Sequence, residues 1–264
     1  MLKGFDHLVV LVQDLDKGSR DFEEMGFTVV PGGRHGSGTH NALIAFDDGS
    51  YIELIAFYQP NEAHRWWKWK VSGGGFIDYC MRSSNLDEDL AAFSAAGVVY
   101  GAPYQLTRKR PDGYELDWEI AVPQDPRLSG APFLIRDKTP RGERAPVYTA
   151  HPNGVQRIRR MVHAVQNIDL VDAWAGPLQG AQSQPVIRPD LMARGLRATV
   201  AVGDKTASTV DFLAPDLEKS PLTAALLEHG AAPYALEFSG SDASIRFDAK
   251  QSHGARFIMA SENS

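Results

Sequence analysis

The feature that most constrains this chain is an internal repeat. Residues 76–97 (FIDYCMRSSNLDEDLAAFSAAG) align without a gap on residues 5–26 (FDHLVVLVQDLDKGSRDFEEMG). In both copies an apolar run is followed by an Asx-Leu-Asp triplet, a stretch with helical spacing and a closing glycine. Asx residues favour the first position of a helix and glycine favours its end, so each copy predicts a strand followed by a helix.

Further strands complete the first copy. We expect them over residues 27–30, 41–46 and 51–57, because each is a short apolar run bounded by turn-forming residues. The order is therefore β-α-β-β-β, and a sheet made from one such unit leaves one face uncovered. Two units are expected to combine into a curved mixed sheet with a concave cleft. The sequence thus predicts an α+β protein built from repeated βαβββ modules.

Later copies of the unit are less complete. The second copy continues with more expected strands, and a run of glycines at 73–75 separates it from the first. A fainter third copy is indicated by residues 166–169 (QNID), which align on residues 13–16 (QDLD). The predicted organisation is a pair of modules over residues 1–140, a Pro-rich and charged linker over 141–156, and a degenerate third and partial fourth module over 157–264.

Composition and charge exclude several classes of protein. The 264 residues are 43% hydrophobic and 23% charged, which is typical of a globular chain with a sizeable core. The net charge is −6, no basic block suggests nucleic-acid binding, and no run of 18 apolar residues suggests a membrane span. The single cysteine, Cys80, permits no internal disulfide. We expect a cytoplasmic protein whose partner is a small molecule, and the sequence leaves a homodimer open.

Several segments resemble the glyoxalase-like branch of the vicinal-oxygen-chelate superfamily. They are FDHLVVLVQDLD, GGRHGSGTHNALIAF, YIELIAF, RKRPDGYELDWEIA, APFLIRD and HPNGV. The resemblance covers residues 5–170 well and implies a divalent metal in the cleft. In that superfamily a His on the first strand and a Glu on the last strand of a module hold the metal, and here those positions are His7 and Glu53. Fe, Mn, Zn and Ni all suit such a pair, and metal-free members also exist.

The residues themselves support a role for His7 and Glu53. Each is a polar residue in an apolar strand and shares its strand parity with apolar neighbours. A buried carboxylate needs a cation, a hydrogen-bond partner or a shifted pKa. The alternative is a His–Glu hydrogen bond that merely satisfies two buried groups. Glu53 is also a candidate for moving a proton in catalysis.

The later copies do not repeat this pair. Asp78 occupies the position of His7 in the second copy and is a candidate ligand or catalytic base. Arg160 occupies it in the third copy, which is therefore expected to have lost the site. His163 lies three residues further on, so it has the opposite parity and is expected to be a packed or surface histidine.

Loop and strand residues could complete the site. His35 and His40 flank a Gly-rich loop, and only one of His40 and its neighbour Asn41 can face the cleft. Resemblance to the family's GT-x-N pattern favours Asn41, and both are candidates for substrate binding. His151, in the sequence HPNG, is a candidate catalytic residue, with a simple tight turn as the alternative.

Two arginines add a possible anion site. Arg108 and Arg110 precede the turn sequence Pro111-Asp112-Gly113, and the strand after it carries Trp118. Arginine beside an aromatic wall suits a planar carboxylate or phosphate, so all three are candidates for substrate binding. A solvated basic turn is the alternative.

Two functions from different classes fit these residues. The first is a metal-dependent enzyme of lyase, isomerase or dioxygenase type that acts on a small oxygenated organic molecule. A divalent metal on His7 and Glu53 would bind neighbouring substrate oxygens, and Glu53 or a loop histidine would move a proton. The second is a metal-free binding protein of the bleomycin-resistance type, in which aromatic walls hold the ligand. The metal content of the purified protein separates the two.

Overall fold

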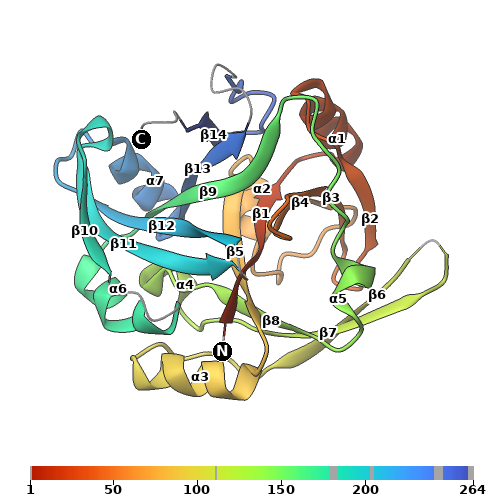
Figure 1. Cartoon of the computed structure of the whole chain (residues 1–264), viewed down its shortest axis with the longest axis horizontal. Coiled ribbons are helices and arrows are strands. Elements are labelled where there is room, and N and C mark those ends of the chain that lie inside the picture. Colours follow the sequence, from red (N-terminus) through yellow and green to blue (C-terminus); the bar gives the residue numbers. More distant parts are fainter. Residues whose placement is uncertain (1, 111, 179–182, 203–204, 241–245, 261–264) are drawn as a thin grey trace.

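The computed structural model describes residues 2–110, 112–178, 183–202, 205–240 and 246–260, which form two curved sheets and their covering helices (Figure 1). The eight-stranded sheet has the order β2-β3-β4-β1-β5-β8-β7-β6, and the six-stranded sheet has the order β10-β11-β12-β9-β13-β14. The predicted fold class, α+β with curved mixed sheets built from repeated modules, is confirmed. No helix in the described ranges is long and apolar enough to span a membrane.

The first half of the chain supplies the eight-stranded sheet. Its elements are β1 (Leu2–Leu11), α1 (Leu15–Glu24), β2 (Val30–Arg34), β3 (Thr39–Ala45), β4 (Tyr51–Phe57), α2 (Trp67–Val71), β5 (Gly75–Ser83), α3 (Leu86–Ala95), β6 (Tyr104–Lys109), β7 (Glu115–Ala121), α4 (Pro126–Ser129) and β8 (Phe133–Asp137).

The second half begins with a short connecting helix. Its elements are α5 (Arg141–Arg144), β9 (Val155–Ala164), α6 (Ile168–Trp174), η1 (Gly176–Leu178), β10 (Gln184–Arg188), η2 (Pro189–Leu191), β11 (Ala193–Val202), β12 (Lys205–Pro215), α7 (Pro221–His229), β13 (Ala232–Gly240) and β14 (Arg256–Met259).

The pairing of β1 with β5 explains the repeat in the sequence. The two strands lie antiparallel at the centre of the sheet, and each is parallel to the last strand of its own module, β4 or β8. His7 opposes Cys80 and Val9 opposes Asp78. The gapless alignment matches residue 7 with residue 78 and residue 9 with residue 80. It therefore converts the pair His7–Cys80 into the pair Asp78–Val9, which is the second pair observed. The two modules are therefore related by an approximate twofold axis.

The helices begin where the repeat predicts. The Asp14 carboxylate accepts a hydrogen bond from the Lys17 backbone N–H at the start of α1, and the Asn85 side chain accepts one from Glu88 at the start of α3. Such caps satisfy backbone donors that have no partner within the helix and contribute about 1 kcal/mol each. The shared Asx-Leu-Asp triplet is thus the start of a helix in both modules.

The six-stranded sheet uses the same connectivity. Strand β9 is parallel to β12 and antiparallel to β13, which is in turn parallel to β14. The third module is complete, whereas the described part of the fourth contains only strands that correspond to a first and a last strand. The predicted domain boundaries at 140 and 156 stay predictions.

One apolar core joins the two sheets and thereby fixes which face of β1 is free. Leu8 of β1 and Met81 of β5 are fully buried in the same cluster as Met161 of β9. Because side chains alternate along a strand, Val9 points to the other, concave face, where a second apolar cluster lies. His7 shares this parity and lies on the concave face as well.

The eight-stranded sheet curls until its edge strands β2 and β6 come together. A Cβ atom on Gly33 would lie 3.0 Å from Cδ of Arg108, and one on Gly32 would lie 2.0 Å from Oδ1 of Asn41. Only glycine permits an approach this close. The Pro-Gly-Gly sequence that begins at residue 31 therefore closes one side of the concave face.

Candidate functional site

The concave face of the eight-stranded sheet holds a cavity of about 810 Å³. This volume is typical of sites for small organic ligands. Strands β1, β3, β4, β6, β7 and β8 contribute to its walls, together with the loop before β3 and the segment before α2. The residues predicted for the site that line this cavity are His7, Asn41, Glu53, Arg108 and Trp118.

A buried carboxylate fixes the orientation of His7. Its Nδ1 lies 2.7 Å from Oδ1 of Asp6, which also receives Arg144 Nη1 at 3.0 Å and is fully buried. Burial alone would raise the pKa of Asp6, but the Arg144 and Arg141 guanidinium groups hold that pKa well below its usual value. An ionised carboxylate only accepts hydrogen bonds. Nδ1 of His7 therefore carries a hydrogen and donates a hydrogen bond to Asp6.

In the neutral form of the imidazole, this arrangement leaves a lone pair on the other ring nitrogen of His7. Nε2 faces Oε2 of Glu53 at 3.5 Å, and Oε1 of Glu53 accepts a hydrogen bond of 2.5 Å from Asn41 Nδ2. With a neutral imidazole and an ionised carboxylate, two acceptors face each other here, and a shared cation would satisfy both. A neutral imidazole whose far nitrogen donates to a carboxylate is also the usual form of a metal-bound histidine. The pair therefore fits a divalent metal ion.

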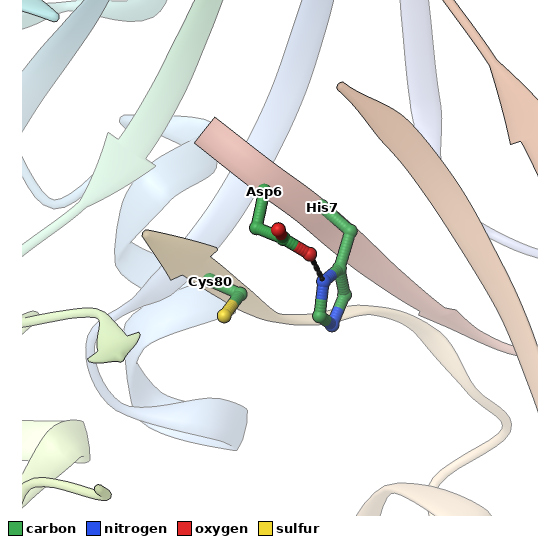
Figure 2. A group of neighbouring side chains, drawn as sticks. All are labelled: Asp6, His7 and Cys80. Carbon is green, nitrogen blue, oxygen red and sulfur yellow. Dashed lines mark hydrogen bonds and ion pairs between the residues drawn. The ribbon is translucent and has the colours of Figure 1, made fainter. Parts of the chain in front are cut away.

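A neighbouring triad is less suited to a metal. Within the described part of the chain, Asp6, His7 and Cys80 are the group that brings three potential ligand atoms within 4.8 Å of one another (Figure 2). Asp6 is already bound by two arginines, and Nδ1 of His7 holds a proton. Burial raises the pKa of the Cys80 thiol well above its usual value, so it remains protonated. Nε2 of His7 and Glu53 are the better ligand pair.

Asp6 is the residue that strand alternation could not predict. Phe5 before it faces the core. In a strictly alternating strand the side chains of Asp6 and His7 would lie on opposite faces of the sheet. The pairing of β1 with β5 is irregular here, because Phe5 opposes Met81 and His7 opposes Cys80, so Asp6 is an extra residue. A β-bulge of this kind redirects a side chain. Its partner Arg144, from the expected linker, also donates to the Tyr51 hydroxyl at 2.5 Å.

Asn41 connects the metal-ligand pair to an arginine. Its Oδ1 accepts hydrogen bonds from Arg108 Nη1 at 3.1 Å and from the Gly33 backbone at 2.8 Å. The neighbouring His40 lies outside the cavity, with its ring 5.8 Å from that of Tyr58. Of the two adjacent candidates, the structure therefore places Asn41 in the site.

Aromatic rings and neutral histidines complete the walls. Trp66, Trp118 and Phe133 line the cavity, as do His35 and His64 from the loops. Burial lowers the pKa of His35, and burial together with the nearby Arg65 lowers that of His64 to about 4. Both imidazoles are therefore neutral at pH 7. No sequence pattern singled out His64, which lies two residues before Trp66.

Asp78 lies outside this cavity although it occupies the repeat position of His7. Its Oδ2 accepts hydrogen bonds from Arg65 Nη1 at 2.5 Å and from Trp66 Nε1 at 3.0 Å. The Cζ atom of Arg65 lies 4.3 Å from the centre of the Trp66 ring and 4.6 Å from that of Phe133. Asp78 thus anchors the segment that forms one wall of the cavity and does not meet His7 and Glu53.

Two more predicted residues are engaged elsewhere. His151 accepts a hydrogen bond from the Thr28 backbone N–H and donates one to the Ala45 carbonyl, both at 3.0 Å, so neither ring nitrogen is free. Arg110 pairs with Asp112 and with Glu143. Pro111, from the predicted turn, lies outside the described residues. Neither His151 nor Arg110 lines the cavity.

The equivalent slot in the six-stranded sheet holds an arginine. Arg160 opposes Thr209 and Asp211 opposes Val162, as His7 opposes Tyr51 and Glu53 opposes Val9. Arg160 lies 3.6 Å from Asp211 and 2.7 Å from Glu237. A guanidinium therefore fills this slot, in line with the expected loss of the site.

His163 is a packed residue with the parity expected of it. Its Nδ1 donates to the Ala164 carbonyl at 3.1 Å, and its ring lies 5.3 Å from that of Tyr79. Burial lowers the pKa of His163 to about 3, so the ring stays neutral.

Comparison with known proteins agrees with this architecture. A family model described as "Glyoxalase-like domain" matches residues 5–178. No curated protein matches the chain. A hypothetical protein from Staphylococcus aureus is similar in structure, with a TM-score of 0.66 and 17% identity, over 97% of this chain and 98% of that chain.

Two further solved structures are similar over 92% of this chain. A mutant of 4-hydroxymandelate synthase from Streptomyces coelicolor has a TM-score of 0.57 and 12% identity and is covered over 72% of its length. A xylose isomerase-like TIM barrel/4-hydroxyphenylpyruvate dioxygenase fusion protein has a TM-score of 0.51 and 14% identity and is covered over 37%. At these identities the likeness shows the fold alone. The chain belongs to the glyoxalase-like domain family of the vicinal-oxygen-chelate superfamily.

Proposed function

We propose that this protein is an enzyme in which His7 and Glu53 bind a divalent metal ion and a small oxygenated organic molecule reacts beside it. The observation that supports this most is the 3.5 Å distance between Nε2 of His7 and Oε2 of Glu53, which lets both atoms contact one ion. Imidazole and carboxylate are ligands that Fe, Mn, Zn and Ni share. The cavity beside them is large enough for such a substrate.

Each group around the pair has a distinct task in this proposal. The metal would supply a Lewis acid that polarises a substrate oxygen. Asp6 keeps the proton on Nδ1 of His7, and Asn41 holds one oxygen of Glu53. His35 is neutral because it is buried and lines the cavity, so its imidazole accepts a proton from the substrate.

Among the reaction types, a lyase or isomerase fits better than an oxygenase. Non-haem iron oxygenases hold their metal with two histidines and one carboxylate. Among the described residues, no third His, Cys, Asp or Glu places a ligand atom within 4.8 Å of those of both His7 and Glu53. The same fold supports several reactions, so this preference rests on the ligand count alone.

Metal content tests the proposal. Protein purified without chelator is expected to carry a single divalent ion per chain, measured by inductively coupled plasma mass spectrometry. The double variant His7→Ala/Glu53→Gln is expected to carry almost none, while His40→Ala, whose ring lies outside the cavity, keeps it. Glu53→Gln retains an oxygen for Asn41, which limits the structural effect. Equal, near-zero metal in all three proteins after incubation with Zn²⁺ or Mn²⁺ would end the metal-dependent version.

A metal-free binding protein is the second candidate function. Three aromatic side chains, Trp66, Trp118 and Phe133, line the cavity and could hold an apolar ligand by stacking. Tight binding of a planar aromatic ligand by protein that takes up no metal would favour this reading. Trp118→Ala is then expected to weaken binding far more than His7→Ala.

A further inference from the structure

Arg108 differs from the other arginines that line the cavity, because no carboxylate neutralises it. Arg65 pairs with Asp78, and Arg144 pairs with Asp6. For Arg108 the described part of the chain provides no ion pair, and the acceptor it reaches is the amide oxygen of Asn41. Its residue is only 5% exposed. Arg108 therefore makes no ion pair within the described residues, and the Glu53 carboxylate acts on it only at longer range, across Asn41.

Leaving this charge unmatched is costly. Burial lowers the pKa of Arg108, because the charged guanidinium has lost most of its water. Nε of Arg108 is buried without a hydrogen-bond partner, and Nη1 donates to Asn41. A buried charge normally has a partner of opposite sign. A ligand that brings one negative charge to the free edge of the guanidinium would satisfy it.

The surroundings of Arg108 define the rest of the ligand. Gln105 and Thr107 of the same strand also line the cavity, but much of its wall is apolar and aromatic. The apolar and aromatic residues include Leu106, Trp118, Ile120, Phe133 and Ile135. An ion with an apolar body matches such walls, whereas a small inorganic anion would leave them exposed to water. The single unmatched cation favours one negative charge over two.

Asn41 sets the distance between this anchor and the reacting centre. It accepts from Arg108 at 3.1 Å and donates to Glu53 at 2.5 Å, so the guanidinium and the carboxylate are bridged by one amide group. An amide oxygen and nitrogen lie about 2.3 Å apart. Nη1 of Arg108 and Oε1 of Glu53 are therefore separated by at most about 8 Å. An anion on Arg108 therefore lies only a few bonds from any substrate atom that reaches Glu53.

We infer that the substrate is a monocarboxylic acid with an apolar or aromatic body, whose carboxylate binds Arg108 and whose nearby oxygenated carbon reacts beside His7 and Glu53. The inference rests on the proposed function for the reacting centre, but the carboxylate anchor stands on Arg108 alone. Guanidinium and carboxylate match in shape and can form two parallel hydrogen bonds, which a neutral amide cannot reproduce.

Binding of three naphthyl probes tests the anchor. Isothermal titration calorimetry would compare 1-naphthylacetate, 1-naphthylacetamide and 1-naphthyl phosphate, each with chelator-treated full-length protein. We expect the acid to bind at least tenfold more tightly than the amide and more tightly than the phosphate. Arg108→Gln, which can still donate to Asn41, is expected to lose this preference for the acid. Arg110→Gln removes an arginine from the same hairpin outside the cavity and should keep it.

The outcomes separate the anchor from the metal. Equal affinity for acid and amide, or a preference that survives Arg108→Gln, would overturn the inference. Tighter binding of the phosphate would also overturn it. Circular dichroism of Arg108→Gln checks that the variant is folded, and unchanged affinity for the amide shows that the cavity is intact. A preference for the acid in protein that never binds metal would keep the anchor and refute the proposed metal chemistry.

Discussion

Replacing Arg144 by Met is expected to destabilise the protein strongly, although the residue lies on the connecting helix α5. The side chain is only 6% exposed and donates to Asp6 at 3.0 and 2.9 Å and to Asp137 at 2.5 and 3.0 Å. Methionine has a similar length but no charge, so Asp6 would remain buried with less compensation. Loss of one partner of a buried ion pair costs about 3–5 kcal/mol. We expect the free energy of unfolding to fall by about this amount.

A double-mutant cycle makes the test specific. Asp6→Asn alone removes the other partner, and the variant with both changes is expected to lose less than the sum of the two single losses, because no unpaired charge remains between them. Urea unfolding followed by circular dichroism gives the three values. Arg194→Met is the matched control, because Arg194 is 71% exposed and its pair with Asp216 should contribute less than about 1 kcal/mol. A loss for Arg144→Met no larger than that of the control would refute the reasoning.

Further predictions concern acid stability and the closure of the sheet. The pKa of Asp6 is lower in the folded protein than in the unfolded chain, so its contribution is complete above the unfolded value of about 3.9 and is lost as the pH falls through the folded value. Native protein should therefore lose stability below pH 4 more steeply than Asp6→Asn in acid unfolding curves; parallel curves would contradict this. Gly32→Ala should lower the free energy of unfolding by about 1–3 kcal/mol and weaken ligand binding, because its Cβ would lie 2.0 Å from Oδ1 of Asn41. Gly142→Ala, whose Cβ would meet no atom within 4 Å and which lies outside the cavity, should lower neither in the same assays.

The repeat was sufficient to predict the fold because its signals are local. Capping residues at Asp14 and Asn85 and the strand periods depend on neighbours in sequence, and the structure places both helices after them. The family resemblance paired His7 with Glu53, strand parity placed each among apolar residues of its own strand, and their side chains lie 3.5 Å apart. Alternation is a property of the extended backbone, so it carries over into the sheet.

The rest of the site depends on contacts that no local pattern encodes. Asp78 matches His7 in the repeat, but the segment with Arg65 and Trp66 folds over it and takes its carboxylate. The partnership of Asp6 with Arg144 joins residues 138 positions apart and needs a bulge in β1. Such differences arise where tertiary packing overrides a symmetric sequence.

Comparison of the two sheets indicates that the carboxylate on the last strand of a module, which faces the first strand, requires a cation. In the six-stranded sheet, Asp211 takes the place of Glu53 and receives Arg197 at 2.6 Å and Arg160 at 3.6 Å. In the eight-stranded sheet no arginine or lysine of the described chain forms an ion pair with Glu53, and Arg108 reaches only Asn41. Both sheets thus contain a carboxylate at this position. Arginines of the chain pair with Asp211 in the six-stranded sheet, whereas no described arginine or lysine pairs with Glu53 in the eight-stranded sheet. This missing charge is the one that the proposed metal ion would supply between His7 and Glu53.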